Sequence, residues 1–91
     1  MVFDMIVNID SRMREAVLRK MMKHDFIGGK HTDIRNIPKG FPKHFYKEIL
    51  KVLDDIMKEG YIIKKPTQYG FHVSLNPRMM DEIKKEIGLV D

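Results

Sequence analysis

A long amphipathic segment that leads directly into a predicted hairpin constrains the fold of this chain most. Within residues 42–60, apolar side chains recur at the spacing of an α-helix: Phe45, Ile49, Val52, Leu53 and Ile56. Pro42 suits a first helical position, where its missing N–H has no intrahelical partner. Gly60 suits the left-handed residue that commonly ends a helix. The segment therefore predicts one helix over residues 42–59.

The predicted hairpin follows this helix without a linker, as two strands over residues 61–65 and 71–75. In the second strand the apolar residues Phe71, Val73 and Leu75 alternate with polar ones, which predicts one buried face and one solvated face. The loop 66–70 between the strands has turn-forming residues, proline and glycine, at its two ends.

The rest of the chain supplies shorter elements around this centre. Asp10-Ser11 is a helix-start signal, and it predicts a helix over residues 11–24. The apolar residues before it fit a helix or a strand equally well. Residues 31–33 fit a short strand, with Thr32 or Asp33 capping a short helix from Ile34. Asn76-Pro77 predicts the start of a last helix over residues 77–87.

Composition places the chain among folded single domains. It has 91 residues, 43% of them hydrophobic and 33% charged, and no cysteine. The absence of cysteine excludes disulfides and zinc–thiolate sites and points to a reducing compartment. The longest apolar runs are too short to cross a bilayer, and the first residues do not resemble a signal peptide. We therefore expect no membrane association and a cytoplasmic location.

The charge balance favours a polyanionic partner. Lysine and arginine number 17 against 13 acidic residues, a formal net charge of +4. The cations between Arg35 and Arg78 spread over the long helix, the hairpin and their loops. The acids of that span all lie on the long helix, mostly near its end: Glu48, Asp54, Asp55 and Glu59.

The stretch HTDIRNIPKGFPKHFYKEILKVLDDIMKEGYIIKKPTQYGFHVSLNP, residues 31–77, resembles the small winged-helix proteins common in archaea. The resemblance rests on a short helix before a Gly-x-Pro turn, on MKEGYIIKK and on PTxYGxxVSLNP. It implies an α+β, mostly helical winged helix-turn-helix with a three-helix core, a two-stranded wing and a C-terminal helix. It divides the single domain 1–91 into an arm (1–10), a helical core (11–60), a wing (61–75) and a last helix (77–87).

The resemblance also implies a DNA-binding module, without catalytic residues. In helix-turn-helix proteins the N-terminal part of the second helix lies nearest the bases. The candidate DNA-binding residues are therefore those of the helix start and the wing: Lys43, His44, Lys47, Lys51, Lys64, Lys65, Thr67, Gln68 and Tyr69. Cations at a helix start oppose its dipole, which an anionic partner would explain. The alternative is an ordinary solvated helix and hairpin.

Catalysis and metal binding have little support. The four histidines form no i,i+4 pair and no dense ligand cluster with the neighbouring acids. No serine or threonine lies in a recognisable nucleophile motif. We therefore expect neither an enzyme nor a cofactor.

Three functions remain open. The first is duplex DNA binding by a transcriptional regulator, with its effector left open. The second is a winged helix for protein–protein contact, favoured by Asp54-Asp55, and the third is binding of RNA or single strands through Tyr46, Tyr69 and Phe71. The apolar stretches Val2–Ile9 and Met79–Ile87 exceed the needs of one core and favour a homodimer. The predicted core contains Val17, Met21, Ile34, Ile49, Leu53, Ile56 and Val73.

Overall fold

The computed structural model describes residues 2–89, and the side chains of residues 11–89. Within this range the chain forms an α+β structure, as the sequence predicts. The α-helices are α1 (Val2–Lys23), α2 (Tyr46–Lys58) and α3 (Met80–Glu86). The strands are β1 (Thr32–Asp33), β2 (Ile62–Thr67) and β3 (Gly70–Leu75). Three turns of 3-10 helix complete the order: η1 (Ile34–Asn36), η2 (Lys43–Phe45) and η3 (Pro77–Met79).

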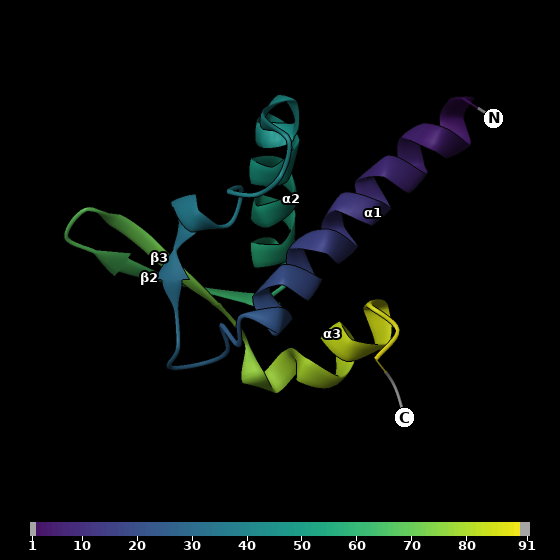
Figure 1. Cartoon of the computed structure of the whole chain (residues 1–91). Helices are drawn as coiled ribbons and strands as arrows, with labels where there is room; N and C mark the ends of the chain where they lie inside the picture. The colour runs from purple at the N-terminus through teal and green to yellow at the C-terminus, as the bar shows by residue number, and fades with distance from the viewer. Residues whose placement is uncertain (1, 90–91) are drawn as a thin grey trace.

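The sheet has three antiparallel strands in the order β1-β3-β2, and not only the two strands of the predicted wing. The third strand is β1, which pairs Thr32 with Val73 and Asp33 with His72. Since β1 has only two residues, it pairs with His72 and Val73 alone. The end of the hairpin nearer the turn therefore has no third strand beside it. The hairpin consequently projects away from the helices (Figure 1).

Helix α1 is longer than predicted, because it begins at Val2 and runs through the expected start at Asp10-Ser11. The segment 1–10 is therefore not a separate arm over its described residues. Residues 2–23 contain neither proline nor glycine. Aspartate and serine destabilise a helix interior by less than about 1 kcal/mol relative to alanine, so a helix can continue through them. They mark a helix start only where the residues before them are not helical.

The end of α1 is made by Asp25, which has a left-handed backbone with φ of 59°. The N–H of Phe26 donates to the Met21 carbonyl at 2.9 Å and that of Asp25 to the Met22 carbonyl at 3.0 Å. This is the hydrogen-bond pattern of a Schellman motif. The same pattern ends α2, where Gly60 has φ of 84°, so the predicted role of Gly60 is confirmed.

The predicted helix 42–59 consists of two parts. Pro42 does not take the predicted first helical position, because its ψ of 137° is extended; the 3-10 turn η2 begins at Lys43, and α2 then continues to Lys58. The predicted apolar stripe of α2 is buried at Ile49, Val52, Leu53 and Ile56. The last predicted helix is likewise divided into η3 and α3, with the Asn76 side chain accepting from the Arg78 N–H as the predicted cap.

The core lies between α1, α2, α3 and one face of the sheet, with α1 and α2 crossing (Figure 1). Six of the seven predicted core residues are completely buried, whereas Ile34 is only half-buried at the edge of the core. Ile83 and Ile87 of the last helix are also buried. The apolar stripe of α3 therefore serves the monomer's own core and gives no support to a dimer.

The hairpin differs from its prediction in two ways. Phe71 is exposed, because it lies in the projecting part of β3, and Ser74 is buried where Phe26–Gly28 runs alongside the end of β3. The strands also extend further than predicted, so that only Gln68 and Tyr69 remain in the turn. The predicted dimer contact through Val2–Ile9 concerns side chains outside the described ones, and it stays a prediction.

Candidate nucleic-acid interface

The four candidate residues at the start of the long helical segment are all exposed. Lys43 and His44 lie in η2, and Lys47 and Lys51 lie in α2. The lysines follow one another at intervals of four residues, which places them along one side of the segment. We refer to Lys43, Lys47 and Lys51 as the lysine ridge.

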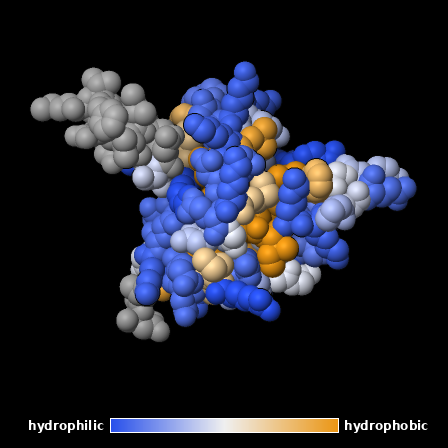
Figure 2. Space-filling model, turned by 180° about the vertical axis from the view of Figure 1, so that it is seen from behind, coloured by the Kyte–Doolittle hydropathy of each residue, from blue (hydrophilic) through white to orange (hydrophobic). Residues whose placement is uncertain are grey.

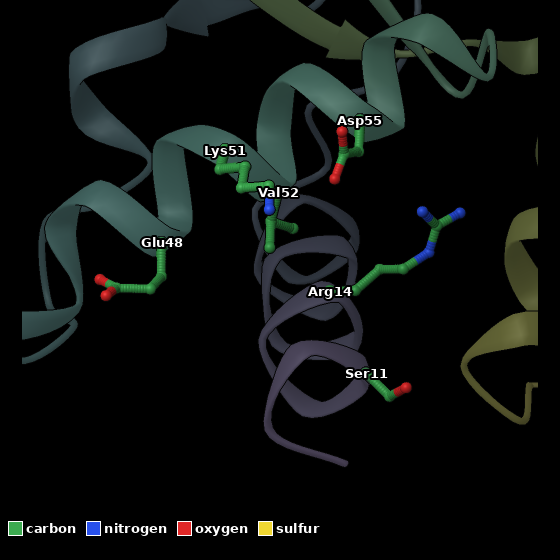
Figure 3. A pocket seen from close by; sticks show the side chains of 6 residues that line it. All are labelled: Ser11, Arg14, Glu48, Lys51, Val52 and Asp55. Carbon is green, nitrogen blue, oxygen red and sulfur yellow. The ribbon is translucent and has the colours of Figure 1, made fainter. Parts of the chain in front are cut away.

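One flank of α2, beside the lysine ridge, is acidic and faces α1. It carries Glu48, Asp55 and, just past the helix end, Glu59. A pocket of about 300 Å³ separates this flank from α1 and is lined by Ser11, Arg14, Glu48, Lys51, Val52 and Asp55 (Figure 3). In Figure 3 the Arg14 side chain extends past the pocket toward the segment after α2 and toward α3, away from Glu48.

Arg14 connects three elements through its guanidinium. Its Nη1 and Nη2 donate to the two carboxylate oxygens of Glu59 at 2.5 and 2.6 Å. Its Nη2 also donates to Glu86 Oε1 at 3.0 Å, and its Nε to Glu86 Oε2. These bonds raise the pKa of Arg14, and the hydrogen bond from Arg14 lowers the pKa of Glu59. Glu59 therefore has a structural role that joins α1 to the end of α2.

Asp54 also has a partner inside the chain, because Lys58 Nζ lies 3.0 Å from its Oδ2. The acidic end of α2 was the sequence feature that favoured a protein partner. That feature was the pair Asp54-Asp55, of which Asp54 is now explained by a contact within the domain, as is the neighbouring Glu59 that Arg14 holds.

The opposite flank of α2 is apolar. Tyr46 and Leu50, one helical turn apart, are each 42% exposed, and Met57 continues the same side. Seen from behind, hydrophobic side chains gather beside the base of the hairpin, among hydrophilic ones (Figure 2).

The turn between η1 and α2 is held by Lys20 of α1. Its Nζ donates to the carbonyls of Asn36 at 3.1 Å, Ile37 at 2.9 Å and Lys39. Carbonyls at a helix end lack intrahelical partners, and Lys20 satisfies them. Burial lowers the pKa of this ammonium. The position of α2 relative to α1 thus depends on Lys20, whose role no sequence motif indicates.

Asp33 fixes the start of η1. Its Oδ1 accepts from the Arg35 N–H at 2.8 Å, which confirms Asp33 as the predicted cap. Its carboxylate also accepts from the Arg35 side chain at 2.7 and 2.9 Å. These hydrogen bonds, that of the side chain first, hold the pKa of Asp33 well below its ordinary range.

The hairpin carries the other five candidates, and all are exposed: Lys64, Lys65, Thr67, Gln68 and Tyr69. Lys64 pairs with Val73 and Lys65 with His72, so the two lysines lie on opposite faces of the sheet. On its face, Lys64 Nζ lies 3.9 Å from the centre of the Phe71 ring. The structure therefore does not bring the two wing lysines together.

Helix α2 and the β2–β3 hairpin diverge from the turn that joins them (Figure 1). The lysine ridge begins at the end of the helical segment far from this turn, and Tyr69 lies at the far end of the hairpin. Each of the two elements is about 20 Å long, because α2 has 13 residues and β2 has six. The candidate residues thus form two clusters and not one continuous patch.

Two histidines that are 41 residues apart in the sequence lie together beside the hairpin base. The Nδ1 atoms of His31 and His72 are 2.8 Å apart. Across the described part of the chain, no three histidine, aspartate or glutamate side chains are placed to hold a metal ion. No helix there is both long enough and apolar enough to cross a membrane.

Comparisons with protein-family models, with curated proteins and with solved structures found no match for this chain.

Sequence reasoning missed three features of this region: the Arg14 and Lys20 anchors and the apolar flank of α2. For the flank a signal existed, since Tyr46 and Leu50 are spaced like neighbours on a helix yet lie off the buried stripe. For the two anchors the sequence carried no signal, because their partners are 16 or more residues away.

Proposed function

We propose that the chain is a winged-helix protein that binds duplex DNA through the lysine ridge and the β2–β3 hairpin. The element order supports this fold, because a short helical turn, η1, precedes α2, and a hairpin follows it. In such a motif α2 enters the major groove and the hairpin contacts the backbone beside it.

The distribution of charge is the observation that carries the proposal. No aspartate or glutamate occurs in residues 34–47 or in residues 60–80. The first stretch forms η1, the turn and the start of the long helical segment, and the second forms the hairpin and η3. Together they contain seven lysines and arginines: Arg35, Lys39, Lys43, Lys47, Lys64, Lys65 and Arg78. These two stretches of the chain therefore suit a polyanion.

A salt titration tests the proposal. If the three lysines of the ridge and Lys64 neutralise one phosphate each, the logarithm of affinity should fall linearly with the logarithm of salt concentration. At about −0.9 for each phosphate, these contacts give a slope of about −3.6. The measurement is fluorescence anisotropy of a random-sequence duplex at several salt concentrations. Lys47→Ala should flatten the slope by about one and weaken binding to all sequences alike.

The matched control is Lys84→Ala, which removes another exposed helical lysine, from α3. It should leave the slope unchanged, because α3 lies on the other side of the hairpin base from the lysine ridge (Figure 1). Equal effects of both substitutions would indicate non-specific attraction to the net charge. No binding below about 10⁻⁴ M at low salt would refute nucleic-acid binding.

The second candidate function is contact with another protein, and the exposed flank of α2 favours it. Tyr46 and Leu50 are large apolar side chains on the helix proposed to enter the groove. Aromatic residues are enriched in protein interfaces. A protein without measurable DNA affinity, whose partner is lost on Leu50→Ala, would support this function instead.

A further inference from the structure

Exposed apolar side chains coincide with the proposed DNA-binding elements. Among the described side chains six large hydrophobic ones are exposed, and five of them lie on α2 or the hairpin: Tyr46, Leu50, Ile63, Tyr69 and Phe71. A duplex offers phosphates and base edges in its grooves, which polar side chains read. Flat apolar surface next to lysines suits a ligand that also exposes the faces of its bases.

Tyr69 is the extreme case, with 80% of its surface exposed. It occupies a turn of only two residues between Thr67 and Gly70, which pair with each other. Gly70 has φ of 145°, a conformation that suits glycine and closes this tight turn. The hairpin tip projects from the body (Figure 1), which agrees with the high exposure of Tyr69.

The lysines behind this tip add a second, independent observation. Lys64 and Lys65 lie on opposite faces of the hairpin, at neighbouring positions of one strand. A single backbone running along one face can meet only one of them. Two backbones that pass on either side of the hairpin can each meet one lysine, and the aromatic tip then faces the point at which they part.

We propose that the hairpin is a wedge that binds forked DNA, meaning a duplex whose two strands separate at one end. Tyr69 stacks on the last base pair of the duplex, and Lys64 and Lys65 contact phosphates of different strands. Side chains that enter between base steps are an established way of binding opened or kinked DNA. The wedge rests on the proposed function and specifies its substrate class.

The first experiment compares a blunt 20-base-pair duplex, the same duplex with two non-complementary single-stranded arms, and one arm alone. Anisotropy at fixed salt should show the fork bound at least about fivefold more tightly than the blunt duplex. Tyr69→Ala should abolish this preference, since one stacked base contributes about fivefold or more to affinity, whereas Tyr69→Phe should keep it. Leu89→Ala, which removes the one exposed large hydrophobic side chain among the described six that lies on neither α2 nor the hairpin, is the control and should leave the preference unchanged.

The second experiment assigns the lysines to strands. Methylphosphonates replace the phosphates next to the junction in one strand or in the other. If the wedge is correct, Lys64→Ala makes binding insensitive to the replacement in one strand, and Lys65→Ala makes it insensitive in the other. Both variants losing sensitivity to the same strand would overturn the wedge.

The outcomes separate the wedge from the proposed function. Salt-dependent binding with equal affinity for fork and blunt duplex overturns the wedge and leaves duplex binding intact. A single arm bound as tightly as the fork also overturns the wedge, in favour of a single-strand site. Absence of binding to every one of these DNAs overturns the proposed function itself.

Discussion

Replacing Arg14 by methionine should destabilise the fold by more than an exposed ion pair does. Among the described side chains of α1, only that of Arg14 donates hydrogen bonds to both Glu59 and Glu86. The Arg14 side chain is 21% exposed. Exposed pairs contribute about 0.2–1 kcal/mol, and hydrogen bonds to charged groups in drier sites about 1.5–3 kcal/mol. Since Glu59 is 46% exposed, we expect a loss of about 1–2 kcal/mol, or roughly 4–16 °C in Tm.

Urea denaturation followed by far-UV circular dichroism measures this loss. The control is Glu15→Gln, which breaks the pair with Arg19 four residues further along the same helix. Both partners of that pair are about half exposed, so its loss should cost less than about 0.5 kcal/mol. Similar values for Arg14→Met and Glu15→Gln would refute the idea that Arg14 holds the three helices together.

Three further substitutions test the rest of the fold. Leu53→Ala should cost about 2–5 kcal/mol in urea denaturation, because Leu53 is completely buried, and Leu50→Ala less than about 1. Lys20→Met should cost about 1–2 kcal/mol and speed amide hydrogen exchange in the turn after η1, unlike Lys23→Met. Asp33→Asn keeps the cap but removes the charge. Because the pKa of Asp33 is lowered in the folded state, its stabilisation exists above pH ~4 and disappears as the pH falls further, so wild type and variant should converge only below pH ~4. A constant difference between them would contradict this.

Periodicity and helix-ending residues predicted most of the helical core, since both act over a few residues. The stripe of α2 and the glycine at its end are confirmed. The same local signals misplaced the start of α1, because Asp10-Ser11 can cap a helix only if the chain before it is not helical. They also predicted wrongly that Phe71 is buried. Phe71 lies on the same face of β3 as Val73, as the alternation predicts, but this part of the strand extends beyond the helices that would cover it.

The candidate site was predictable as a set of residues but not as an arrangement. All nine proposed side chains are exposed, which a pattern of charges already indicated. That Lys64 and Lys65 point to opposite faces follows from strand alternation, once the strand is known to continue through both. The anchoring of Glu59 and of the turn after η1 depends on contacts from α1, and distant contacts leave no trace in one sequence.

The cations that stabilise the fold are different residues from those proposed to bind DNA. Arg14 and Lys20 donate to acceptors within the domain. Among the described hydrogen bonds and ion pairs, none involves the side chains of the lysine ridge, of Lys64 or of Lys65. Exposed substitutions without such partners usually change stability by less than about 0.5 kcal/mol. Lys47→Ala should therefore alter affinity at unchanged stability, and Arg14→Met should alter stability at unchanged salt slope. A loss of DNA binding in Lys47→Ala can then be attributed to the contact itself and not to unfolding.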